Sequence, residues 1–98
     1  MEKPYYVEAL EKHDAALLDQ MQALREFALR DGALPARVKV LMCLLGDALQ
    51  GQSSGVKALA ERARALGATD AEVAETVRLA FYMAGMPGLV TGIHAFKS

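Results

Sequence analysis

The chain has 98 residues, the size of one compact domain, with 53% apolar residues and a formal net charge of −1. With this charge balance the chain has no basic field that would attract nucleic acids or an anionic membrane surface. No apolar run is long enough to span a bilayer. So high an apolar share in so small a domain predicts surface that other subunits cover. We therefore expect a homo-oligomer.

Two features of the sequence bear on the cellular compartment. The N-terminal residues Met1 to Pro4 lack the basic segment and apolar core of a secretory signal. Cys43 is the single cysteine, so no disulfide can form within the chain and no oxidising compartment is required. A cytoplasmic protein is the expectation.

The first third of the chain predicts helices. Pro4 to Leu10 indicates a short helix or an ordered arm, because proline suits a first helical turn. Asp14 is placed to cap an amphipathic helix over Leu17 to Ala28, which we expect to stop at Asp31-Gly32. The pattern leaves open whether Tyr5 to Arg30 forms one helix or two.

A second helix is expected after Pro35, whose missing N–H costs little in a first turn. From Val38 to Leu49 the sequence is apolar nearly all round, which predicts burial on most sides. Cys43 lies within this run and is predicted to be a buried structural residue, since an apolar helix neither lowers the pKa of a thiol nor exposes it.

A polar hinge from Gln50 to Gly55 interrupts the apolar pattern. Ser53 or Ser54 can cap the next helix by accepting a backbone N–H bond. That helix is predicted over Val56 to Leu66, with Gly67 as its stop.

The last third begins with a strong boundary signal. Thr69 and Glu72 form a capping box, in which each side chain satisfies the other residue's backbone N–H. A helix should follow as far as Ala84, then a turn at Gly85 to Gly88, then a short helix over Leu89 to Phe96. No two-residue alternation is sustained, so we predict an all-α single domain of five or six helices.

The order of these parts resembles the carboxymuconolactone decarboxylase family, which belongs with the alkylhydroperoxidase D-like proteins. The resemblance rests on two blocks, G-A-T-x-x-E-V-x-E from Gly67 and A-F-Y-x-x-G-x-P from Ala80. It covers residues 34–96 and leaves 1–33 as an N-terminal helical arm. It implies an all-helical fold that assembles as a homo-oligomer, and we expect a trimer or hexamer.

The resemblance also locates positions where the family carries reactive groups. The two cysteines of the peroxidase branch would fall on Gln52 and Gly55, and its glutamate on Val40. A dithiol peroxidase needs one thiolate to attack peroxide and a second thiol to resolve the sulfenic acid, so this activity is disfavoured. The histidine of either branch would fall on Leu59, which makes this a divergent member.

Two residues are the candidates for catalysis. Asp47 lies in the most apolar helix, where a carboxylate is costly unless it is paired or faces a pocket or interface. It can replace the missing glutamate as an acid/base group, or it can serve only in a salt bridge or helix cap. His94 near the C-terminus is the second candidate, because histidine titrates near neutral pH. His13 is a weaker one.

The candidate substrate-binding residues are polar or aromatic. Gln52, Ser53 and Ser54 stand at the family's reactive position and can bind a carboxylate through hydroxyls and helix N-terminal N–H groups. Tyr82 can form the wall of a small apolar pocket, although residues at such spacing also form ordinary core. The histidines have no cysteine or second histidine beside them, so no metal site is predicted. No cofactor motif is present.

Three functions follow. The first is a decarboxylase-like protein that acts on or binds a small organic acid or lactone between helices, using Asp47 or His94. The second is a catalytically degenerate oligomer that binds a ligand or a protein. The third, the thiol peroxidase, is disfavoured by residues 52–55.

Overall fold

The computed structural model describes residues 4–97, and within them every regular element is helical. The described chain contains six α-helices and one 3-10 turn. This confirms the all-α prediction. The contacts divide the chain into two compact units, Met1–Arg30 and Asp31–Ser98. Within residues 4–97, every helix is too short or too polar to serve as a membrane span.

The first unit is a pair of helices, α1 (Tyr5–His13) and α2 (Ala15–Leu29), so the segment left open by the sequence is two helices. Asp14 separates them, and its carboxylate accepts a hydrogen bond from Leu17 N at 3.1 Å, which confirms the predicted cap. Leu18 is the one residue that these two helices bury.

The end of α2 differs from the expectation. The helix stops at Leu29, three residues before the predicted glycine stop at Gly32, because Arg30 is extended. Asp31 has another role, since its Oδ1 accepts a hydrogen bond from Ala36 N at 2.6 Å. The carboxylate thus satisfies a first-turn donor of the next helix.

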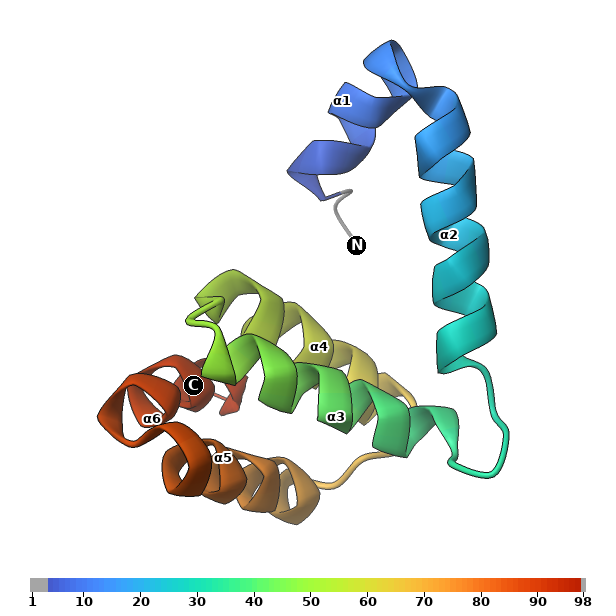
Figure 1. Ribbon diagram of the computed structural model, residues 1–98. Helices are drawn as coiled ribbons and strands as arrows, with labels where there is room; N and C mark the ends of the chain where they lie inside the picture. The colour runs from blue at the N-terminus through green and yellow to red at the C-terminus, as the bar shows by residue number, and fades with distance from the viewer. Residues whose placement is uncertain (1–3, 98) are drawn as a thin grey trace. The chain divides into compact units, whose positions relative to one another are not determined.

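The second unit consists of α3 (Ala36–Leu49), α4 (Ser53–Ala65), α5 (Asp70–Ala84), α6 (Met86–Gly92) and the 3-10 turn η1 (Ile93–Ala95). Figure 1 shows α3 and α4 as an antiparallel hairpin, and α3 also packs against α5 and α6. The core between them is built from small and medium side chains: Leu44, Ala48, Val56, Ala60, Val73, Val77, Ala80 and Ala95. Such side chains allow the helices to approach closely.

Helix α3 buries one face only. Val40, Leu44 and Ala48 are buried, whereas Met42 and Cys43 are exposed. The prediction that this helix is buried on most sides is therefore wrong for the single chain, and so is the predicted burial of Cys43. An apolar pattern without a polar face cannot indicate which side meets the core.

The turn after α5 is made by one glycine. Gly85 has φ +67° and ψ −149°, a conformation that side chains with a Cβ avoid, and it ends α5 and begins α6. Helix α6 therefore starts at Met86 rather than at the predicted Leu89, because Pro87 fits a first turn. A Cβ on Gly88 would overlap the carbonyl oxygen of Ala80, so α6 lies directly against the backbone of α5.

The start of α5 is as predicted. Thr69 Oγ1 accepts a hydrogen bond from Glu72 N at 3.1 Å, and the Glu72 carboxylate accepts one from Thr69 N at 2.9 Å. The same carboxylate pairs with Arg37 at the start of α3, 35 residues away. The hydrogen bond from Thr69 N–H, and to a smaller extent the one from the Arg37 guanidinium, hold the pKa of Glu72 below its usual range.

This lowered pKa predicts how acid acts on stability. The unfolded chain protonates Glu72 before the folded chain does, so its contribution is present at neutral pH and is lost as pH falls through the folded-state pKa. Glu72→Gln keeps an acceptor for Thr69 N but removes the titration. We expect its melting temperature to fall less than that of the wild type between neutral pH and about pH 3. Glu75→Gln, on the exposed side of α5, should behave like the wild type. Equal slopes for Glu72→Gln and the wild type in calorimetry would contradict the assignment.

Candidate functional site

The hinge between α3 and α4 places a carboxylate beside a helix N-terminus. Asp47 lies in the last turn of α3, and its backbone oxygen accepts a hydrogen bond from Gln52 N at 2.9 Å. This bond closes the hinge and sets where α4 begins. A Cβ on Gly55 would overlap Asp47 Oδ2, so the carboxylate occupies the space that a larger residue would fill.

The Asp47 side chain is half-buried and carries no partner among residues 4–97. No hydrogen bond or ion pair to its carboxylate occurs there. A negative charge is tolerated at this place because the N-terminus of α4 carries partial positive charge. The salt bridge offered as its structural role is thus absent within the described chain, and the carboxylate is available to a ligand.

The first turn of α4 supplies unused donors. Gln52 is the residue that precedes the helix and makes no side-chain cap bond, while Ser53 and Ser54 are the first two helical residues. The expectation that a serine caps α4 is therefore wrong, because the chain enters the helix one residue before Ser53. Within residues 4–97 the N–H groups of Ser53, Ser54 and Gly55 have no hydrogen-bond partner. Such donors suit an anionic or carbonyl oxygen.

The other two predicted site residues are exposed and form no bond to the hinge cluster of Asp47, Gln52, Ser53 and Ser54. His94 is exposed in η1, which packs on α4 through the buried Ala95 rather than through the histidine. Tyr82 on α5 is 85% exposed. Neither makes a hydrogen bond or ion pair with another described residue. The hinge therefore brings together Asp47, Gln52, Ser53 and Ser54, whereas no hydrogen bond or ion pair within residues 4–97 joins His94 or Tyr82 to them.

One residue that the sequence did not single out is Arg62 on α4. Its Nε atom is buried and has no hydrogen-bond partner among residues 4–97. The other two arginines at this end of the unit are paired, Arg37 with Glu72 and Arg64 with Asp70. The Arg64 hydrogen bond is the main cause that lowers the pKa of Asp70. Sequence reasoning missed Arg62 because a basic residue in the last turn of a helix is an ordinary helix-end feature.

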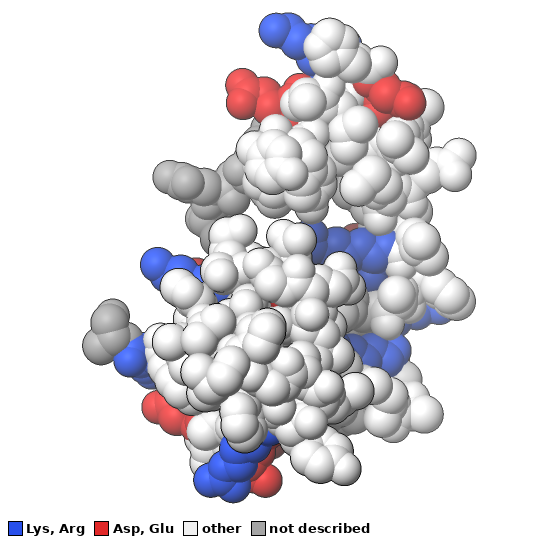
Figure 2. Space-filling view, turned by 60° about the vertical axis from the view of Figure 1, so that its left-hand side comes forward, with Lys and Arg blue, Asp and Glu red and all other residues white. Residues whose placement is uncertain are grey.

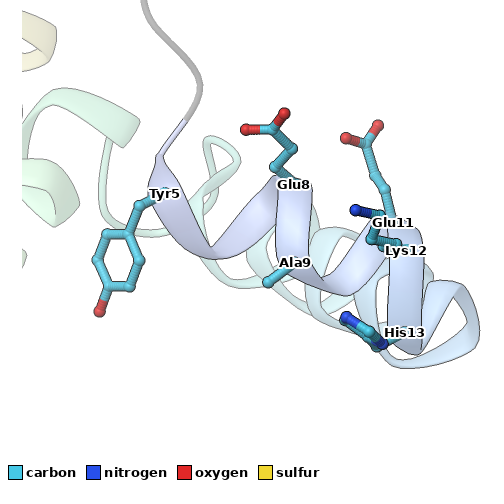
Figure 3. Close-up of a pocket in the computed structure, with 6 residues that line it drawn as sticks. All are labelled: Tyr5, Glu8, Ala9, Glu11, Lys12 and His13. Atoms are coloured by element: carbon cyan, nitrogen blue, oxygen red, sulfur yellow. The ribbon is translucent and has the colours of Figure 1, made fainter.

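A separate hollow lies on the first unit. An open depression of about 550 Å³ is lined by one face of α1, including Tyr5, Lys12 and His13 (Figure 3). Its polar side chains all come from that single helix, and the close-up shows Glu8 and His13 on opposite sides of it. Among residues 4–97 no group of three His, Cys, Asp or Glu residues is arranged to hold a metal ion.

Comparison with known proteins gives one match. The model of the carboxymuconolactone decarboxylase family matches residues 15–98. The matched range begins at the start of α2 and includes the hinge cluster and Arg62. No curated protein and no solved structure matches the chain.

The contact between Asp47 and Gly55 predicts that a single methyl group displaces the carboxylate. In Gly55→Ala the new Cβ overlaps Asp47 Oδ2, so the Asp47 side chain must rotate away. Stability should change by less than about 1 kcal/mol, because alanine favours a helix and the obstacle is the end of a side chain. Gly46→Ala is the matched control, since a Cβ there meets nothing within 4 Å. Crystal structures of both variants check this, and an unmoved carboxylate in Gly55→Ala would refute it.

Proposed function

Because the chain belongs to the carboxymuconolactone decarboxylase family, we propose that it binds and decarboxylates a small organic acid or lactone at the hinge cluster of Asp47, Gln52, Ser53 and Ser54. The observation that carries this proposal is the unpartnered Asp47 carboxylate seated on Gly55 beside the free N–H groups of α4. A proton-transfer group and oxygen-binding donors then stand at one end of one hairpin.

The chemistry of each group suggests its role in the proposed site. The N–H groups and hydroxyls of Ser53 and Ser54 bind a substrate oxygen, which places the reacting carbon near Asp47. Loss of CO₂ breaks a carbon–carbon bond and leaves its electron pair on the substrate. A proton from water then takes the place of the carboxyl group, and Asp47 passes that proton to the carbon. His94 and Tyr82 have no assigned role in this step.

Asp47→Asn tests the role of the carboxylate. The amide keeps the shape of the side chain but cannot transfer the proton, so we expect CO₂ release from a carboxylated muconolactone to fall roughly 10²–10⁴-fold with the fold intact. Glu61→Gln, at an exposed position of α4, is the control and should keep full activity. If the wild-type protein releases no CO₂ above the uncatalysed rate, the decarboxylase proposal fails and the non-catalytic binding protein becomes the better hypothesis.

We also propose that the protein functions as a homo-oligomer, a trimer or hexamer, through the apolar surface of α5 and α6. The second unit leaves many large apolar side chains exposed on α5, on α6 and in the chain that follows them: Leu79, Phe81, Tyr82, Met83, Met86, Val90, Ile93 and Phe96. The face around α6, which is turned forward in Figure 2, consists mainly of uncharged residues. Contiguous apolar surface of this kind on a small domain is typical of a protein interface. A cytoplasmic location remains our expectation, since the single thiol suits a reducing compartment.

The oligomer is tested by mass. Light scattering should give three or six times the chain mass of 10.5 kDa. Met83→Glu places a charge on the proposed interface, where burying it is costly, and should shift the mass toward that of a single chain. Lys57→Glu, which adds the same acid on an exposed part of α4, should leave the mass unchanged. A wild-type protein with the mass of one chain would overturn this proposal.

A further inference from the structure

We infer that Arg62 determines ligand specificity by binding a carboxylate of the substrate remote from the reacting end; this inference rests on the proposed function of the hinge cluster. Its first support is the buried Nε atom without a hydrogen-bond partner among the described residues. Buried polar groups are nearly always hydrogen-bonded, so an unsatisfied one in a native protein indicates a missing partner. For a guanidinium the natural partner is an anion.

The helix dipole explains why a positively charged residue lies at position 62, but it does not explain why the Nε–H is buried without an acceptor. A cation in the last turn of α4 is stabilised by the helix dipole wherever its nitrogens point. The dipole gives no acceptor to the buried Nε–H. A carboxylate that approaches an arginine from the side accepts from Nε–H and from one terminal N–H together. The unused donor is therefore one half of a bidentate carboxylate site.

The position of Arg62 relates it to the hinge cluster. It follows Gly55 by seven residues, which is two helical turns, so the two lie on the same side of α4 and about 10 Å apart along the axis. Asp47 rests on Gly55 at one end of this side, and Arg62, whose buried Nε has no partner within residues 4–97, lies at the other. Leu59, between them, packs against the core and offers no competing polar group.

This arrangement selects a class of ligand. An elongated acid can place one end beside Asp47 and its carboxylate on Arg62, whereas a neutral lactone of the same length satisfies only the hinge end. Arg37 and Arg64 cannot serve in the same way, because each already holds a carboxylate. Arg62 thus favours organic acids over neutral lactones.

The probe for this site is benzoate, with benzamide as its neutral counterpart of the same shape. In ¹H–¹⁵N spectra of the full chain, benzoate should shift the Arg62 Nε–H resonance and benzamide should not. Arg62→Met should weaken benzoate binding about tenfold or more, the effect of losing a charge-assisted bidentate pair. Lys57→Gln removes the same charge from an exposed position of α4 and should bind benzoate like the wild type.

Thermal unfolding separates a binding role from a structural one. Removing an unsatisfied buried donor should leave the melting temperature of Arg62→Met unchanged or raise it, whereas a structural arginine would lower it. Equal benzoate affinity in Arg62→Met and the wild type would overturn the inference. A second result would also overturn the inference. If the Arg62 Nε–H resonance is already shifted without benzoate and moves when the protein is diluted, a carboxylate of a second copy of the chain is its partner.

Kinetics separate this inference from the proposed function. If the protein decarboxylates a carboxylated muconolactone, Arg62→Met should raise KM about tenfold with a smaller change in kcat. An unchanged KM would overturn the role of Arg62 and leave the decarboxylase proposal standing. If the protein shows no decarboxylation but benzoate still binds through Arg62, the carboxylate site stands and the assigned reaction fails.

Discussion

Burial of one face of α3 is the constraint on which the second unit depends. Val40, Leu44 and Ala48 are inaccessible on that face, and α4, α5 and α6 all pack against the helix. Because their partners are mostly alanines and valines, the helices approach closely and the core stays thin. Any side chain at the C-terminal end of α3 is therefore held near the start of α4, and this is where Asp47 lies.

The close approach of α3 and α4 forms the proposed site at the hinge between them. Gly55 leaves room for the Asp47 carboxylate, and the hydrogen bond from Gln52 N to the Asp47 backbone oxygen holds the chain in the turn. The same helix carries Arg62 two turns later, and its buried Nε has no hydrogen-bond partner among residues 4–97. The groups that we propose for acid/base chemistry and anion binding on this side of α4 include no cysteine of the kind that the family's peroxidase branch uses.

The apolar surplus of the sequence is distributed in a way that bears on assembly. Part of it fills the core, but Met42 on α3 and a series of side chains on α5 and α6 remain at the surface of the single chain. The exposure of Cys43 follows from the same fact, since it lies on the side of α3 that faces away from the buried residues. The sequence predicted that α3 is buried on most sides, and the proposed oligomer is where its exposed surface would be covered.

The sequence by itself determined the helices, the capping box of Thr69 and Glu72, the cap at Asp14 and the family. These features depend on residues three or four positions apart, or on motifs read in order, so local chemistry is sufficient. It located Asp47 and the hinge residues as candidates but could not say whether the carboxylate was paired, and it overlooked Arg62.

Only the tertiary structure decided which face of α3 is buried, that Asp47 rests on Gly55, and that Glu72 pairs with Arg37 while Arg62 Nε has no partner within residues 4–97. Each of these depends on the packing angle and distance between two helices. Those quantities are set by the shapes of many side chains together, and no local pattern in the sequence contains them.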